Sequence, residues 1–361
     1  MKYPELEHRK GVALPRYGDY NCVFKYILEQ GAGVRCVLPP PITRRTLELG
    51  AANSPDTVCV PFKTLLGSMI ESLEAGAETL VMSFGDCRLG YFGELQEQTL
   101  RDMGYQFDFV NLQQYNTGKP QDLLKGVRKV NPRMKYTALV RAALDAMKML
   151  DYVDRFNDRF YQISGFARDR KAACDIQAEF LKAMYAATTR EEIEAGWEKA
   201  AAAMEALPLD KPQEPLRVGI IGEYFTVMDP PSNLFLEKKL ADMGVEVHRW
   251  MNLSSSQLKQ YGGKNLRVRV QDLCRYAMGP VTTENVWCAR NWAEAGYDGI
   301  IHVKSAACTP EIDAMPLLQQ ISSETRVPFL FLNYDTQTSD VGLMTRLEAF
   351  YDMIAMRKKV V

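Results

Sequence analysis

Three cysteines stand where three predicted β-strands end, and they carry the clearest chemical signal in the chain. Cys59 lies in TVCVPFK, Cys87 in MSFGDCRLGYFG and Cys308 in HVKSAACTPE. The carboxyl ends of the strands form the ligand crevice of an open α/β sheet. Thiolates gathered there favour an iron–sulfur cluster or zinc. The pattern therefore predicts a metal site with these three cysteines as ligands, and three unrelated loop thiols are the alternative.

A site built on three thiolates keeps one coordination position open. On a four-iron cluster that position can hold water, substrate or a fourth ligand, as a catalytic metal centre requires. Zinc held by the same three cysteines and a water molecule is an alternative. No Cys-x-x-Cys pair occurs, and the histidines are His8, His248 and His302. These facts argue against a ferredoxin-type cysteine run, a zinc ribbon and a multi-histidine zinc site.

The other five cysteines are interpreted as core or incidental residues, because a lone cysteine in a globular domain usually behaves as a small hydrophobe. Cys36 falls inside a predicted strand. Helical patterns contain the remaining four, which are Cys22, Cys174, Cys274 and Cys288.

Three charged residues near the predicted crevice are candidate catalytic residues. Lys63 and Arg88 closely follow Cys59 and Cys87 and could bind an acidic substrate, a CoA phosphate or the negative charge of a cluster. The alternative for both is a surface charge at a helix start. Glu223 follows the strand in RVGIIGEY and could donate or accept a proton. A carboxylate that stabilises a turn is its alternative.

Two further polar residues receive structural interpretations. Glu311 lies in the first turn of a predicted helix, where a favourable interaction with the helix dipole explains it. His302 is interpreted as a core residue of a strand. Neither GxxxxGK[ST] nor a complete GxGxxG occurs, so we expect no ATP or NAD bound through those phosphate loops.

Short apolar runs rich in Val, Ile and Phe alternate with helical patterns, which predicts parallel sheets covered by helices. The predicted strands are 34–40, 57–61, 79–85 and 107–112 in the first half and 217–224, 245–253, 298–305 and 327–334 in the second. The predicted helices of the first half are about 42–50, 63–76 and 91–104. A last helix is predicted by the spacing of Leu343, Leu347, Phe350 and Ile354.

This alternation predicts an α/β fold with two Rossmann-like domains that contain parallel sheets and are joined by a helical segment. The predicted limits are 1–133 for the first α/β domain, 134–207 for the helical segment and 208–361 for the second α/β domain. LRDMGYQFDFVNL at 100–112 is similar to LADMGVEVHRWMNL at 240–253, which supports two similarly wound halves. Since the three cysteines come from both halves, we expect their site between the halves.

The charge balance limits the partners that the chain can have. The 361 residues carry a net charge of -1, from 44 basic and 45 acidic side chains, so we expect no nucleic-acid partner. The opening MKYPELEHRK shows no secretory signal, and no apolar run reaches about 18 residues. We therefore expect a cytoplasmic protein without a membrane segment, in a compartment that keeps thiols reduced.

Three stretches of the sequence, taken together, resemble the 2-hydroxyacyl-CoA dehydratase superfamily. They are residues 39–96, from PPPITRRTLELG to YFGELQ, residues 222–247, GEYFTVMDPPSNLFLEKKLADMGVEV, and residues 306–322, AACTPEIDAMPLLQQIS; GLMTRLEAF at 342–350 follows them. The likeness is closest to the activase-related branch of single-chain proteins, which is also related to the double-cubane cluster proteins. It covers both α/β halves, and the helical middle matches less distinctively.

The resemblance implies a [4Fe–4S] cluster held between two Rossmann-like domains by Cys59, Cys87 and Cys308. A larger cluster is an alternative, although a double cubane would need more cysteine ligands. The resemblance also implies a partner, an ATP-hydrolysing activator with its own iron–sulfur cluster that supplies electrons at very low potential. The sequence departs from the family at Asp86, because Gly-Pro usually precedes the second cysteine and this chain has Gly85-Asp86 there. This change bears on the type and potential of the cluster.

The function predicted from these observations is an iron–sulfur redox protein of the 2-hydroxyacyl-CoA dehydratase type. The protein would accept electrons from the activator and pass them to a small substrate, for example an acyl-CoA. It would act as a reductase or as a dehydratase-like lyase component. A non-catalytic electron-transfer or cluster-carrying partner is one alternative. A metal-free, two-domain protein that binds a small molecule is another. A homodimer fits the architecture, although no residue indicates one.

Overall fold

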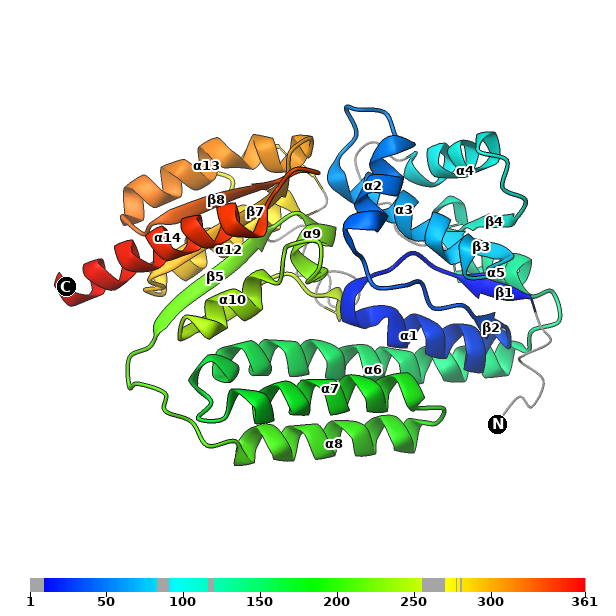
Figure 1. The fold of residues 1–361 in the computed structure, drawn as a ribbon, viewed down its shortest axis with the longest axis horizontal. Helices are drawn as coiled ribbons and strands as arrows, with labels where there is room; N and C mark the ends of the chain where they lie inside the picture. The colour runs from blue at the N-terminus through cyan, green and yellow to red at the C-terminus, as the bar shows by residue number, and fades with distance from the viewer. Residues whose placement is uncertain are drawn as a thin grey trace. The chain divides into compact units, whose positions relative to one another are not determined.

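The computed structural model describes residues 10–82, 91–115, 120–254, 270–276, 278–279 and 281–360. The chain divides into two compact units, shown in Figure 1. The first unit consists of Met1–Val153 and Ala178–Lys199, and the second of Asp154–Gln177 and Ala200–Val361. The domain limits at 133 and 207 stay predictions of the sequence.

Three long helices occupy the segment that the sequence predicts to be helical. They are α6 (Tyr136–Ile163), α7 (Arg170–Ala186) and α8 (Arg190–Ala206), which lie side by side in Figure 1. Within the first unit the ring of Tyr152 stacks on Trp197 with the ring centroids 5.0 Å apart, which joins α6 to α8. Among the helices of the described residues, none combines the length and apolar character needed to cross a membrane.

The first unit contains a four-stranded parallel sheet with the order β2-β1-β3-β4. Its strands are β1 (Gly11–Ala13), β2 (Arg35–Cys36), β3 (Thr79–Met82) and β4 (Asp108–Asn111). Its other helices are α1 (Asn21–Tyr26), the π-helical turn Ile27–Ala32, α2 (Arg44–Ala52), α3 (Val60–Glu74), α4 (Phe92–Asp102) and α5 (Pro120–Val130). The predicted helices of this half are thus confirmed to within a few residues.

One predicted strand of the first half is wrong, and one strand was not predicted. Residues 57–61 form no strand; a turn leads through Cys59 directly into α3. Pro61 suits the first turn of a helix, where its missing N–H is not needed, whereas a central strand would lose a hydrogen bond there. The strand β1 takes a central place in the sheet instead. It has three residues, which is too short to produce a periodic signal in the sequence.

Two glycines let α2 and α3 approach each other closely and so set the position of the start of α3. A Cβ on Gly50 would lie 1.7 Å from the carbonyl oxygen of Lys63, and one on Gly67 would lie 1.9 Å from that of Thr46. The Thr46 hydroxyl also donates to the buried Glu71 carboxylate at 2.7 Å. The helix that begins after Cys59 is therefore held by backbone contact with α2.

The second unit contains a parallel sheet with the order β6-β5-β7-β8. Its strands are β5 (Leu216–Gly222), β6 (Val245–Arg249), β7 (Gly299–Ser305) and β8 (Phe329–Tyr334), which confirms the four strands predicted for this half. The chain runs from β5 outward to β6 and then returns to β7 on the other side of β5. The strand order therefore reverses between β5 and β7, and such a reversal is the usual ligand site of an open α/β sheet.

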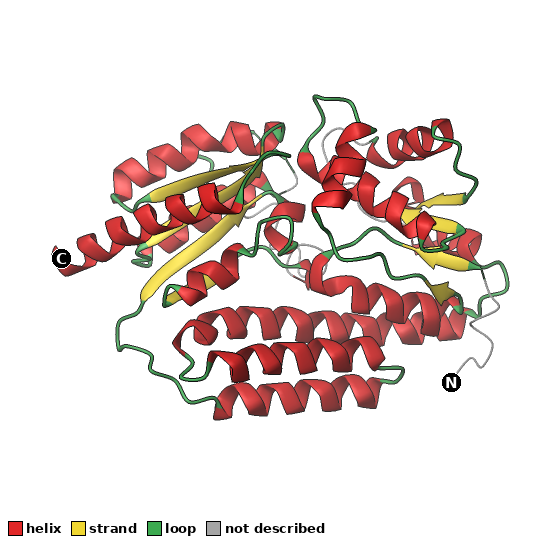
Figure 2. Cartoon of the chain, in the orientation of Figure 1, coloured by secondary structure: helices red, strands yellow, loops and turns green. Residues whose placement is uncertain are grey.

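Helices cover both faces of this sheet (Figure 2). They are α9 (Tyr224–Met228), α10 (Leu236–Asp242), α12 (Thr282–Glu294), α13 (Thr309–Thr325) and α14 (Asp340–Val360). Ile221 and Ile300 pack with Val286 of α12 and Leu318 of α13 on one face. On the other face, a Cβ on Gly299 would lie 2.5 Å from the Phe350 ring of α14. The four apolar positions predicted for the last helix, Leu343, Leu347, Phe350 and Ile354, are buried as expected.

We predict that Gly50→Ala lowers the free energy of unfolding by about 2 kcal/mol or more, because the added methyl group would meet the backbone of α3. Urea denaturation followed by circular dichroism measures the change. The control is Gly342→Ala, since a Cβ there approaches only the Ser339 hydroxyl, at 3.1 Å, on the exposed start of α14. That variant should be neutral or stabilised by up to about 1 kcal/mol. Equal effects of the two substitutions would contradict the close packing of α2 on α3.

Candidate functional site

Cys308 lies at the start of α13, after the end of β7 in the second unit. It is the N-cap residue of the helix, with extended backbone angles of φ -81° and ψ 96°, and Pro310 follows in the first turn. Its carbonyl oxygen accepts the first helical hydrogen bond, from Ile312 at 3.0 Å. Its side chain does not cap the helix. The thiol is therefore held at the positive end of α13, where a negatively charged group is favoured.

Cys59 occupies the same local position in the first unit. It is the N-cap residue of α3, with φ -67° and ψ 160°, and Pro61 follows in the first turn. The prediction that both cysteines precede helix starts is confirmed. The prediction that Cys59 ends a strand is wrong, because the preceding residues form a turn.

Cys87, the third predicted ligand, and Arg88, a candidate catalytic residue, lie outside the described residues. Cys87 follows β3 in the chain as Cys308 follows β7, and both strands are the third of their sheets. Within the described residues, no three or more His, Cys, Asp or Glu side chains are arranged to hold a metal ion. Cys59 and Cys308 belong to different units, and each is described in its own unit. Their thiol chemistry and their helix-start positions fit an anionic iron–sulfur cluster.

Glu223 caps the short helix α9 at the carboxyl end of β5. One carboxylate oxygen accepts from the Phe225 N–H at 2.8 Å. The other accepts from the N–H and hydroxyl of Thr226 at 2.8 and 2.6 Å. Burial raises the pKa of Glu223, the charge of Glu311 adds to this rise, and the bonds from Thr226 and Phe225 oppose it. Both oxygens thus serve the helix, so the structure favours the turn-stabilising interpretation of this residue.

Backbone contact between β5 and β7 holds Glu223 in this position. The Glu223 N–H donates to the carbonyl oxygen of Val303 at 2.8 Å. Gly222 has a φ of +145°, and a Cβ there would lie 1.9 Å from the same Val303 oxygen. Only glycine fits this close approach. Glu223 and Cys308 therefore follow the two adjacent strands that flank the reversal of strand order.

Lys63, the third candidate catalytic residue, turns back toward the segment before Cys59. Its ammonium group donates to the carbonyl oxygen of Asp56 at 3.2 Å. This contact fixes the turn that leads into α3, as expected for a charge at a helix start.

Sequence reasoning missed a buried polar cluster behind Cys308, formed by Glu311, His302, Asn285 and Thr282. Each of these side chains is at most 1% exposed. His302 was correctly placed in the core, but its partner is Glu311, whose carboxylate lies 2.7 Å from the His302 Nε2. The interpretation of Glu311 by the helix dipole alone does not account for its burial. A signal was present in the sequence, since His302 inside an apolar strand needs a polar partner.

Lys304 is a second residue that sequence reasoning missed. It lies near the carboxyl end of β7, is only 8% exposed, and donates to Asn333 Oδ1 at 2.9 Å. Burial lowers the pKa of its ammonium group, whereas the negative charges of Cys308 and Glu311 oppose the shift. A positive charge at this edge of the sheet would favour the thiolate form of a nearby cysteine, or an anionic group that this cysteine binds.

Three of the other five cysteines have thiols whose pKa is raised by burial, which agrees with their interpretation as core residues. Burial raises the pKa of the Cys22 and Cys36 thiols to about 12 and that of Cys288 well above its ordinary value. Such thiols are protonated at neutral pH and are poor metal ligands. Cys174 is exposed on α7.

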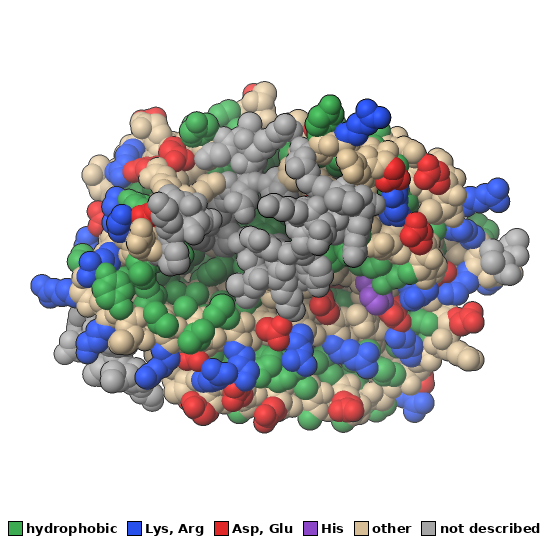
Figure 3. Space-filling view, turned by 180° about the vertical axis from the view of Figure 1, so that it is seen from behind, with side chains coloured by type: hydrophobic (Ala, Val, Ile, Leu, Met, Phe, Trp, Pro, Cys, Tyr) green, Lys and Arg blue, Asp and Glu red, His purple; other side chains and the backbone are tan. Residues whose placement is uncertain are grey.

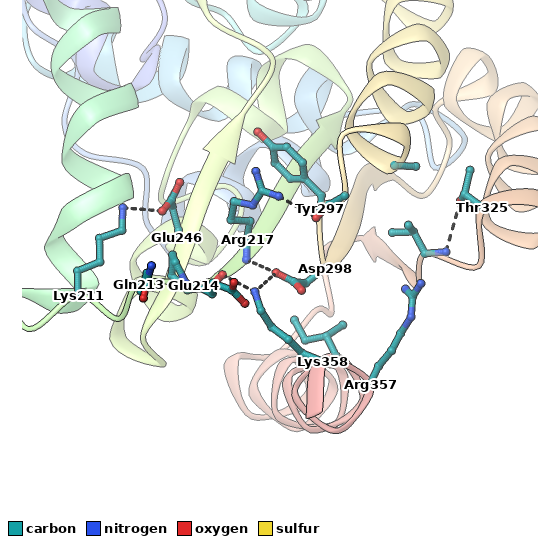
Figure 4. A pocket seen from close by; sticks show the side chains of 15 residues that line it. Lys211, Gln213, Glu214, Arg217, Glu246, Tyr297, Asp298, Thr325, Arg357 and Lys358 are labelled. Carbon is teal, nitrogen blue, oxygen red and sulfur yellow. Dashed lines mark hydrogen bonds and ion pairs between the residues drawn. The ribbon is translucent and has the colours of Figure 1, made fainter. Parts of the chain in front are cut away.

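A cavity of about 830 Å³ lies at the opposite edge of the second sheet, near the amino ends of its strands (Figure 4). Lys211 pairs with Glu246 at 2.5 Å and Lys358 with Asp298 at 3.1 Å along its wall. Two of its basic side chains are thus paired with carboxylates, and the Arg217 guanidinium donates to the carbonyl oxygens of Ala295 and Gly296 at 3.3 and 2.9 Å. Basic and acidic side chains are also interspersed over the described part of the face drawn in Figure 3.

Comparison of the sequence with models of known families finds a match over the second part of the chain. The family model described as 2-hydroxyglutaryl-CoA dehydratase, D-component, matches residues 146–354, which is more than half of the chain. The matched span contains Glu223, Lys304, Cys308 and Glu311, and it begins after Cys59 and Cys87 in the chain. No curated protein matches the sequence.

We predict that Lys304→Met stabilises the metal-free protein at pH 7, by on the order of 1 kcal/mol, because folding no longer buries an ammonium group. The pKa of Lys304 is lower in the folded than in the unfolded state. The cost of burying its charge is therefore present at neutral pH and disappears as the pH rises toward the ordinary lysine pKa. The gain in melting temperature over the unchanged protein should shrink between pH 7 and about pH 10.5.

The matched control for this measurement is Lys182→Met, at an exposed lysine of α7 in the first unit. Its effect on the melting temperature should be small at both pH values. A gain for Lys304→Met that does not change with pH would show that side-chain packing, rather than charge burial, causes it.

Proposed function

This chain belongs to the family of the 2-hydroxyglutaryl-CoA dehydratase D-component and is a 2-hydroxyacyl-CoA dehydratase-type component, and from that membership we propose an electron-transferring role for it. In this proposal the protein carries an iron–sulfur cluster, with [4Fe–4S] as the expected type. It receives low-potential electrons from an ATP-hydrolysing activator protein that has its own cluster. It passes them one at a time to a small substrate, for which an acyl-CoA is the first class to test.

The observation that carries the proposal is the shared position of two of the expected ligands. Cys59 and Cys308 are both N-cap residues, each has proline two residues later, and neither side chain caps its helix. Each thiol is thus carried by the residue at which a helix starts, and the amides of a first helical turn suit the sulfur atoms of an anionic cluster. Cys87 is proposed as the third ligand on the sequence pattern.

When bound, such a cluster supplies single electrons at low potential, and one of its iron ions would have no cysteine ligand. The task of the chain is then to hold the thiolates, to orient the substrate and to exclude water. Lys304, buried at the carboxyl end of β7, supports the negative charge of the site.

The proposed substrate contacts are Lys63, Arg88 and Glu223. Lys63 would have to leave the Asp56 carbonyl oxygen to reach an acidic group. Three hydrogen bonds from α9 occupy three of the about four acceptor positions of the Glu223 carboxylate, so a substrate proton would have to approach the position left on Oε1. The main contribution of Glu223 to the site is therefore structural, because its carboxylate caps α9 at the end of β5.

We predict that the anaerobically purified protein contains about four iron and four acid-labile sulfide atoms per chain. Single Cys59→Ala, Cys87→Ala and Cys308→Ala variants should each lose most of the iron, and the triple variant all of it. Iron and sulfide analysis, with the visible absorption of the cluster, measures this. Cys174→Ala is the matched control and should keep its iron, because Cys174 is exposed on α7 and is not one of the expected ligands.

Iron that persists in the triple variant would reject these three cysteines as ligands. A protein without iron after anaerobic reconstitution would favour the metal-free binding protein. Zinc in place of iron would favour a zinc site on the same thiols. A cluster that accepts electrons but supports no turnover of any acyl-CoA tested would favour a non-catalytic electron carrier.

A further inference from the structure

We infer that Glu311 is a positioning residue for Cys308, acting through the buried cluster of Glu311, His302, Asn285 and Thr282 that ties the start of α13 to α12, β7 and the end of β5. The inference rests on the proposed function only in taking Cys308 as a ligand. The contacts that support it belong to the second unit alone.

The Glu311 carboxylate accepts hydrogen bonds from three different residues. The Thr282 hydroxyl donates to Oε1 at 2.9 Å, and Asn285 Nδ2 donates to Oε1 and Oε2 at 3.1 and 3.2 Å. His302 Nε2 lies 2.7 Å from Oε2. The Nδ1 atom of His302 is buried without a partner among the described residues. An imidazole that carries its proton on Nε2 satisfies the carboxylate and leaves no buried N–H unpaired.

Asn285 extends this cluster to the end of β5. Its Nδ2 donates to the carbonyl oxygen of Gly222 at 2.9 Å, and its Oδ1 accepts from the Gly222 N–H at 3.2 Å. Asn285 of α12 is thus hydrogen-bonded to both backbone groups of Gly222 and to the Glu311 carboxylate. The two sides of the reversal in strand order are therefore joined through a single side chain.

The direction of the Glu311 side chain distinguishes this arrangement from ordinary helix capping. A glutamate three residues after an N-cap commonly turns back to bond the N-cap N–H. Here the Cys308 N–H donates to the Ser305 carbonyl oxygen at 3.1 Å instead. The Glu311 side chain is buried and fixes the first turn of α13 to the core. Cys308 is the N-cap residue of the same turn, so a restraint on Glu311 also restrains the backbone of Cys308.

A second contact restrains the same turn from outside the cluster. A Cβ on Gly279 would lie 2.8 Å from the Cβ of Pro310, so the segment before α12 packs directly on the proline that follows Cys308. The first turn of α13 is thereby held at Pro310 and at Glu311. Loss of the Glu311 anchor removes one of these two restraints on the turn that carries Cys308.

The test is the rate at which iodoacetamide alkylates Cys308 in the metal-free protein, measured by mass spectrometry of its peptide. We expect Glu311→Ala to raise this rate by about tenfold or more, because several buried hydrogen bonds that oppose local opening are lost. Glu311→Gln should give a smaller rise, since its amide keeps part of the network. The exposed Cys174 is the internal reference and should react at the same rate in every variant.

Two further variants protect the test against general destabilisation. Thr282→Val removes one hydrogen bond to Glu311 without changing the shape of the side chain, and it should raise the Cys308 rate by about two- to tenfold if Glu311→Ala does not fold. Glu237→Gln disturbs another buried pair of the same unit, in which Arg249 Nη1 lies 3.0 Å from Glu237 Oε2. It should lower the melting temperature and leave the alkylation of Cys308 unchanged.

An unchanged Cys308 rate in folded Glu311→Ala and in Thr282→Val would overturn the inference, and so would an equal rise in Glu237→Gln. These results are independent of whether a cluster binds, because the protein is metal-free. Iron that remains in Cys308→Ala would instead reject the proposed function and leave the alkylation result standing. If both proposals hold, Glu311→Ala that is reconstituted with iron should also release it faster to a chelator than Glu237→Gln does.

Discussion

The carboxyl end of β5 can lie against β7 only because residue 222 has no side chain. The left-handed φ of Gly222 and the closeness of the Val303 carbonyl oxygen exclude a Cβ at this point. The backbone of Gly222 is bonded on its other side to Asn285, and the next N–H is bonded to Val303. The start of α9, the cap formed by Glu223 and the cluster around Glu311 all depend on this single contact. A side chain at position 222 would displace each of them.

In each unit a cysteine occupies the N-cap position of a helix whose first turn contains proline. An extended N-cap cysteine is followed by a residue of the helix and then by proline, whose fixed φ suits the first turn and whose missing N–H costs no hydrogen bond there. This arrangement needs support from a neighbouring helix. In the first unit this support is the contact of α2 with α3 through Gly50 and Gly67, and in the second it is the hydrogen bonding of α12 to Glu311. Backbone packing and buried polar bonds thus serve the same end.

Prediction from the sequence succeeded where a pattern was long enough to have a period. The four strands of the second half and the helices α2, α3, α4 and α14 fall close to their predicted places. It failed at β1, which has three residues, and at 57–61, where Val and Cys before a proline look like a strand but form a turn and a helix start. Tertiary context decided the first case, because β1 carries no signal of its own. In the second case Pro61 already favoured a helix start over a strand.

The sequence by itself determined the α/β class, the likeness of the two halves and the helix starts after Cys59 and Cys308, because these follow from periodicity, proline positions and strand composition. Only the tertiary structure decided how Glu223 and Glu311 are used. A glutamate at a helix start has the same sequence signature whether its carboxylate faces solvent, caps its own helix or enters the core. Glu223 caps α9, whereas Glu311 is buried against His302, Asn285 and Thr282. The partners that make this difference come from other elements, and their distance is set by folding and not by spacing along the chain.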